Sequence, residues 1–174
     1  MSIPQDDFYS IFQGEGDFYD EIHSLDQEKF NEWVSNSFEK IATISSFNEV
    51  APSENTINEF RERGYIHKES QCHYSAKAIS LLNPEFEYWT GFINRDDYLY
   101  PIVTHSFNLY KGKVIDLARV DKHLKPLDIE STSLPHVYYG IKIPHDFVKK
   151  YEKETFNEFS MEPLLVDWYK ANND

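Results

Sequence analysis

The chain is poor in cysteine, in glycine and in long apolar runs. One cysteine among 174 residues excludes an internal disulfide and any scaffold that depends on one. The six glycines form neither G-x-G-x-x-G nor G-x-x-x-x-G-K-[ST], which argues against the nucleotide-binding folds built on those loops. The longest apolar runs are too short to span a membrane. Residues 1–7 lack the basic start and apolar stretch of a signal peptide, so we expect a soluble cytoplasmic domain.

Positive charge is also scarce. The chain has 17 Lys and Arg against 30 Asp and Glu, which gives a formal net charge of −13. Such a field repels nucleic-acid phosphates and anionic lipid headgroups, so we expect neither direct nucleic-acid binding nor membrane attachment. The same charge permits an alternative role, in which an acidic surface binds and inhibits a nucleic-acid-handling enzyme by charge mimicry. The densest group of carboxylates for that surface lies within residues 6–21.

Aromatic and apolar side chains, in contrast, are abundant. With 40% hydrophobic and 16% aromatic residues the chain can bury a core, and its length suits one domain. We interpret residues 1–24 as an irregular acidic and aromatic arm. Residues 25–174 are expected to form a single α+β domain, in which N-terminal helices pack on a central antiparallel sheet and C-terminal helices follow. Periodicity and turn residues predict helices over 26–45, 53–63 and 163–171, another after Pro144, and strands over 86–93, 101–110, 113–118 and 137–143.

The single cysteine lies where its thiol can be activated. Ala76 and Ile79 belong to one apolar helical face, and Asn83-Pro84 ends that helix, which places Cys72 in the first turn. Free backbone N–H groups at a helix N-terminus favour the thiolate, which is the reactive form. A nearby imidazole can take the thiol proton and return it to a leaving group, and a carboxylate can orient that imidazole.

A predicted β-hairpin supplies the imidazole and the carboxylate. If Lys111-Gly112 is a two-residue loop, Tyr110 pairs with Lys113 and the register of both strands is fixed. His105 and Asp116 then lie on one face as diagonal neighbours, about 7–8 Å apart at the backbone. A three-residue loop would place them on opposite faces, so this hypothesis depends on the register.

A cysteine that opens a helix, a histidine on a strand and an aspartate on the next strand resemble the papain-like cysteine hydrolases, in particular their transglutaminase-like branch. The resemblance covers about residues 70–144 and rests on order and placement. It implies a papain-like or transglutaminase-like fold and acyl transfer or amide hydrolysis through a thioester. In this family pattern Cys72 is the nucleophile, His105 the base and Asp116 the acid that orients the base.

Three further residues are candidate substrate contacts: Gln71, His73 and Trp89. Gln71 adjoins the cysteine, whereas papain-like proteases place an oxyanion glutamine several residues before it. For Trp89 a position in the core is the alternative. The expected substrate is a peptide, a protein side-chain amide or a small acyl compound, and the residues do not discriminate among these.

Two other interpretations of the same residues stay open. A lone cysteine is often a small buried apolar side chain, which would make Cys72 part of the core. Cys72 and His73 with His105 and Asp116 also have the ligand types that bind zinc, but the spacing of a metal motif is absent. We therefore expect no metal or other cofactor.

Overall fold

A computed structural model of the chain describes residues 12, 14, 16–95, 102–128, 134–150 and 161–173. Three helices and a strand come first: α2 (Asp17–Ser24), α3 (Gln27–Ser37), β1 (Glu39–Ile44) and, after the short η1 (Phe47–Val50), α4 (Glu54–Glu62). The middle of the chain forms α5 (Cys72–Leu82), β2 (Glu87–Asn94), β3 (Ile102–Tyr110), β4 (Lys113–Ile115) and η2 (Leu117–Arg119). The described chain ends with β5 (His136–Ile143), α6 (His145–Lys149) and α7 (Leu165–Asn173).

The strands form one antiparallel sheet in the order β1-β5-β2-β3-β4. Two glycines allow its central strands to approach closely, because Gly91 of β2 pairs with Gly140 of β5. A Cβ at Gly91 would lie 2.5 Å from the Gly140 Cα, closer than real side chains pack. The α+β class and the central antiparallel sheet expected from the sequence are confirmed.

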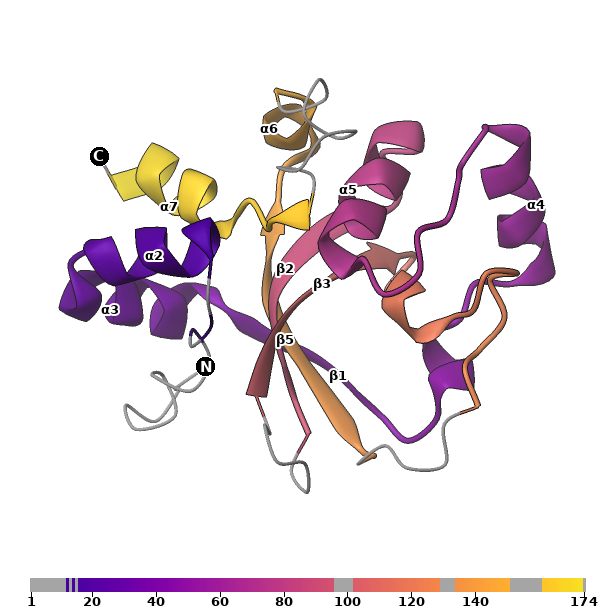
Figure 1. The fold of residues 1–174 in the computed structure, drawn as a ribbon, viewed down its shortest axis with the longest axis horizontal. Coiled ribbons are helices and arrows are strands. Elements are labelled where there is room, and N and C mark those ends of the chain that lie inside the picture. The colour runs from indigo at the N-terminus through magenta and orange to yellow at the C-terminus, as the bar shows by residue number, and fades with distance from the viewer. Residues whose placement is uncertain are drawn as a thin grey trace.

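Helices flank this sheet on both sides (Figure 1). On one side α2, α3 and α7 gather, and their buried residues form a cluster with Phe92 of β2. On the other side α4 and α5 pack with the segment around β4 and η2, through residues such as Phe60, Ile79 and Ile115. No helix in the described part of the chain is long and apolar enough to cross a membrane.

Two parts of the N-terminal half differ from the expectation. The helix predicted over 26–45 ends at Ser37, and residues 39–44 form β1, which pairs with β5. Ile41 and Ala42 continue the helical spacing of the apolar residues before them. In the structure they nevertheless lie on β1, beside β5, which is distant in the sequence. Residues 17–24, predicted to belong to an irregular arm, form α2 and bury Phe18 in the core. Most of residues 1–15 lie outside the described part of the chain.

The segments that carry the candidate site form as predicted. Cys72 is the first residue of α5, and the chain leaves the helix at Asn83. In the hairpin Tyr110 pairs with Lys113, so Lys111-Gly112 is the two-residue loop. Both loop residues have positive φ, +51° and +79°, as a type I′ turn requires. β4 is shorter than predicted, because residues 117–119 leave the ladder as η2.

Candidate functional site

Cys72 stands at the N-terminal end of α5, and its side chain is partly exposed. Gln71 precedes it as the N-cap residue and makes no capping bond with its side chain. The first N–H groups of a helix have no acceptor within the helix. Such groups carry partial positive charge, and at this end of α5 they favour a negative charge on the sulfur of Cys72. Gln71 itself points to solvent.

His105 and Asp116 are in direct contact. Nε2 of His105 lies 2.7 Å from Oδ2 of Asp116, and both residues are buried. The hairpin register brings them together, since β3 carries His105 and Asp116 directly follows β4. Because Asp116 holds a negative charge, Nε2 of His105 is the nitrogen that donates. Nδ1 of His105 is therefore the nitrogen left to exchange a proton with another group.

Three further contacts hold the Asp116 carboxylate in place. The Tyr138 hydroxyl donates to Oδ2 at 2.6 Å, and the Ala118 backbone N–H donates to Oδ1 at 3.0 Å. Nε of Arg119 lies 3.9 Å from Oδ2. Burial acts to raise the pKa of Asp116, but the charge and hydrogen bond of His105, with help from Arg119 and Tyr138, lower it to about 2. The carboxylate is therefore ionised across the neutral range.

The Cys72 thiol is tuned by two imidazoles. Burial acts to raise its pKa, but the charges of His73 and His105 and hydrogen bonds to both lower it well below the usual value for cysteine. The pKa of His105 moves the opposite way. Burial acts to lower it, while the charge of Asp116, then that of Cys72, raises it to about 9. The directions are those of a thiolate paired with an imidazolium.

His73 is anchored through a group of buried hydroxyls. Its Nδ1 lies 2.6 Å from Oγ of Ser106, which in turn donates to Oγ1 of Thr90 at 3.0 Å. The Tyr88 hydroxyl lies 3.5 Å from the same Ser106 oxygen. These contacts tie the start of α5 to the middle of the sheet.

The structure thus brings together four of the six residues singled out from the sequence: Cys72, His73, His105 and Asp116. Gln71 is adjacent but exposed. Trp89 lies in the core, 6% exposed, stacked on Phe107 with its indole N–H donating to Glu87. That position corresponds to the core alternative for Trp89.

No group of three or more His, Cys, Asp or Glu within the described ranges is arranged to hold a metal ion. The imidazole of His105 and the carboxylate of Asp116 face each other, and that contact uses the atoms a shared metal would need.

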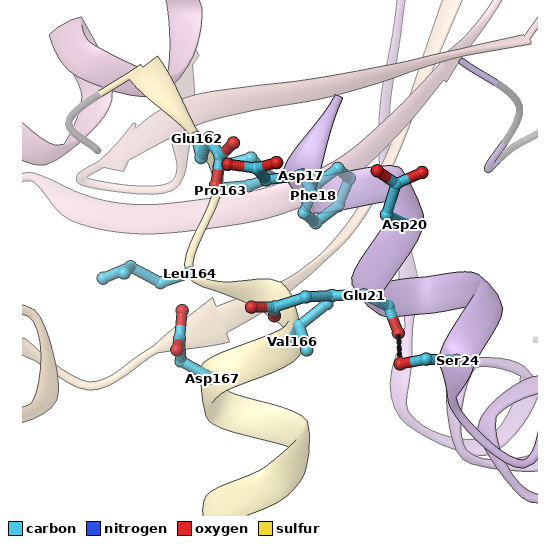
Figure 2. A pocket seen from close by; sticks show the side chains of 10 residues that line it. All are labelled: Asp17, Phe18, Asp20, Glu21, Ser24, Glu162, Pro163, Leu164, Val166 and Asp167. Atoms are coloured by element: carbon cyan, nitrogen blue, oxygen red, sulfur yellow. Dashed lines mark hydrogen bonds between the residues drawn. The ribbon is translucent and has the colours of Figure 1, made fainter. Parts of the chain in front are cut away.

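A cavity of about 590 Å³ opens away from these residues, between α2 and the segment that leads into α7 (Figure 2). Carboxylates from both segments line it: Asp17, Asp20, Glu21, Glu162 and Asp167. Burial, and then the charges of Asp17 and Glu21, raise the pKa of Glu162. The backbone N–H of Leu164, another lining residue, donates to the Tyr88 hydroxyl at 3.2 Å.

Sequence reasoning missed Tyr138, Ser106 and Arg119. Tyr138 and Ser106 sit within aromatic or apolar strand patterns, where a hydroxyl carries no local signal. Each meets its partner only through tertiary structure, because Tyr138 reaches Asp116 from β5 and Ser106 reaches His73 from β3.

Comparisons with protein-family models, with curated proteins and with solved structures find no match to this chain. The chemistry of the site is therefore inferred from its geometry.

Proposed function

We propose that this protein is a cysteine-dependent enzyme of the papain-like or transglutaminase-like kind, which transfers an acyl group or hydrolyses an amide through a thioester. The observation that carries the proposal is the 2.7 Å contact between His105 Nε2 and Asp116 Oδ2 beside a thiol of lowered pKa. A buried imidazole–carboxylate pair beside a thiol of lowered pKa at a helix start supplies the base and the orienting acid that a cysteine nucleophile needs.

In the proposed acylation the Cys72 thiolate attacks the carbonyl carbon, a C–S bond forms, and the C=O electron pair moves to oxygen. The backbone N–H of Cys72 at the helix start is placed to donate to that oxygen. The intermediate collapses when Nδ1 of His105 gives its proton to the leaving nitrogen or oxygen. Asp116 keeps the other ring nitrogen protonated and stabilises the imidazolium.

In the proposed second half, an acyl acceptor (water or an amine) loses a proton to His105 and attacks the thioester carbon. The C–S bond breaks, the thiolate returns, and the imidazolium is regenerated. The substrate is a peptide, a side-chain amide or a small acyl compound. No cofactor takes part in these steps.

The charge-mimicry alternative draws on the acidic cavity, since Asp17, Asp20 and Glu21 belong to the carboxylate cluster noted in the sequence. Excess carboxylates also simply solvate a surface, and this role leaves the buried His105–Asp116 pair unexplained. The enzyme is therefore the function we put forward.

The test is covalent labelling by an activated ester. Incubated with p-nitrophenyl acetate, the folded protein should gain one acetyl group on Cys72, seen by intact and peptide mass spectrometry. Cys72→Ala should gain none, and His105→Ala should acylate at least a hundredfold more slowly, because loss of an opposite charge moves a pKa by about 1–3 units and the thiol loses the imidazolium that favours its thiolate. Labelling that needs unfolding would overturn the proposal, make Cys72 a core residue and favour the acidic surface.

A further inference from the structure

Arg119 brings a fixed positive charge to the carboxylate that holds His105. Its Nε lies 3.9 Å from Oδ2 of Asp116, the same oxygen that accepts from His105 at 2.7 Å and from Tyr138 at 2.6 Å. A separation of 3.9 Å is too long for a hydrogen bond, and this buried Nε makes none with any described residue. Arg119 therefore acts on Asp116 by charge and leaves the hydrogen bonds of Oδ2 to His105 and Tyr138.

The local structure holds this charge in place. Asp116 is the N-cap of η2 and Arg119 is its last residue, a spacing at which side chains of a 3₁₀ turn lie one above the other. The Arg119 backbone N–H donates to the Asp116 carbonyl at 3.1 Å, and its carbonyl accepts from the Leu127 N–H at 3.0 Å. The guanidinium lies over the Phe47 ring, 5.4 Å from the centroid, and the side chain is 18% exposed. A cation held in this way stays beside Asp116 throughout a reaction.

The proposed reaction changes the charge of His105 while Asp116 stays negative. In the resting state the thiol proton is on Nδ1, so His105 is an imidazolium that pairs with Asp116 and compensates the Cys72 thiolate. In the acyl-enzyme that proton has left with the leaving group, the thioester sulfur is uncharged, and His105 is neutral. It must stay neutral until it takes a proton from the acceptor. Asp116 by itself opposes this, because its negative charge favours the imidazolium.

We propose that Arg119 is a positioning residue whose charge lowers the proton affinity of His105, so that His105 is neutral in the acyl-enzyme and can act as a base. The inference rests on the proposed function, in which His105 gives up one proton and takes another in each cycle. Two cations at one carboxylate oxygen repel each other, so the guanidinium disfavours the imidazolium. The guanidinium also compensates the charge of Asp116 while His105 is neutral. Loss of Arg119 should therefore raise the pKa of His105.

Other titratable or charged groups also surround His105 and its neighbour His136, and the comparison must hold them constant. They come from α5, from β5 and from the end of β2: Cys72, His73, Tyr138, His136 and Arg95. Substitutions at Arg119 leave all of them in place. Cys72→Ala removes the thiolate, as acylation does, so this background reproduces the charges of the acyl-enzyme.

The first experiment is a titration of the His105 imidazole by ¹H–¹⁵N NMR in the Cys72→Ala background, with His105→Ala to identify its signal. Arg119→Met and Arg119→Lys give side chains of similar size, and only the lysine keeps the charge. We expect Arg119→Met to raise the pKa of His105 by about one unit, a tenfold gain in proton affinity. Arg119→Lys should stay close to the parent.

Two further variants make this titration specific. Arg119→Gln is a second neutral variant and should shift His105 as Arg119→Met does. Lys125→Gln is the matched control, because it removes the same charge from a surface lysine that pairs with Glu54. It should leave the titration of His105 unchanged.

The second experiment follows hydrolysis of the acetyl-enzyme that p-nitrophenyl acetate forms on Cys72, between pH 5 and 9. This step needs a neutral His105, so the rate of acetyl loss should rise with pH through the pKa of His105. In Arg119→Met the midpoint should move up by about one pH unit, and the rate below the midpoint should fall about tenfold. A merely structural role of Arg119 would lower the rate at every pH without moving the midpoint.

The two experiments separate this inference from the function on which it rests. The inference is wrong if Arg119→Met and Arg119→Lys give the same pKa for His105, or if Lys125→Gln shifts it as much as Arg119→Met. A parent protein that forms no acetyl-enzyme would instead overturn the proposed function. The titration in the Cys72→Ala background would still decide whether Arg119 acts on His105.

Discussion

Asp116 keeps its negative charge although it is wholly buried. Burying a carboxylate is costly unless hydrogen bonds and an opposite charge compensate it. Here an imidazole, a phenol and a backbone N–H all donate to the two oxygens. One oxygen, Oδ2, accepts from both His105 and Tyr138. Tyr138 is therefore a positioning residue, since its hydroxyl holds Asp116 and its ring packs edge-on against the ring of His105.

Substitutions at Asp116 and Tyr138 should separate charge from position. Asp116→Asn removes the charge that keeps His105 protonated, and we expect acylation by p-nitrophenyl acetate to slow on the order of 10³–10⁴-fold. Tyr138→Phe leaves the charge in place and should slow it about tenfold, since one lost bond to a charged group costs about 1.5–3 kcal/mol and only part of this reaches the transition state. Equal losses in the two variants would contradict a purely positioning role for Tyr138. An unchanged rate in either variant would remove the substituted residue from the site.

The three residues proposed for the chemistry could be predicted because each depends on local structure. Cys72 follows from a helix that begins beside it, and the His105–Asp116 contact follows from a two-residue turn. Tyr138 could not be found in this way. Its hydroxyl meets Asp116 only because β5 crosses the sheet to lie beside β2, a pairing that no local pattern specifies.

Secondary-structure elements also differ in whether local sequence or a distant partner determines them. The hairpin is determined by its turn, because Lys111 and Gly112 both take positive φ and thereby fix the pairing of Tyr110 with Lys113. β1 is determined by a distant partner, since its residues pair with β5, and its apolar spacing fits a helix equally well. Tertiary pairing overrides this ambiguous local pattern, and the predicted helix therefore ran too far.

The close approach of β2 and β5 gives a prediction for Gly91, which also pairs with His105 on β3. In Gly91→Ala the new methyl group would meet the Tyr139 carbonyl oxygen and the Gly140 Cα, both backbone atoms that cannot rotate away. We expect the free energy of unfolding to fall by about 3 kcal/mol, measured by urea denaturation. Displacement of β2 should also disturb His105 and slow acylation.

Gly64→Ala is the matched control for Gly91. Gly64 has φ +82°, but nothing lies within 4 Å of the position that a Cβ would occupy, so its substitution carries backbone strain alone, about 1 kcal/mol. If Gly91→Ala costs no more than Gly64→Ala, the two strands are not held together as closely as the glycines indicate.

At the scale of the whole molecule, several charged side chains act on one buried imidazole, that of His136. It is 1% exposed, and neither ring nitrogen has a hydrogen-bond partner among the residues that the structure describes. Its imidazole feels the charges of four side chains: Arg119 from η2, Arg95 after β2, Asp116 and His105. Burial, then the two arginines, lowers its pKa to about 4. At a pH where an unfolded histidine begins to bind a proton, His136 is therefore still neutral in the folded protein.

This difference makes acid stability depend on His136. Since the pKa is about 6.5 unfolded and about 4 folded, the unfolded state binds the extra proton and stability falls as pH drops through this interval. We expect the free energy of unfolding to fall by on the order of 1–3 kcal/mol between pH 6.5 and 4.

The measurement should be made in a Cys72→Ala background. This substitution removes the thiolate that is paired with His105, and with it the proton that the thiolate itself would take up. In that background His136→Phe should flatten the pH dependence by one proton in urea denaturation. It should be at least as stable at pH 7, because it leaves no unpaired nitrogen beside Phe47. An undiminished slope in His136→Phe would place the acid sensitivity elsewhere.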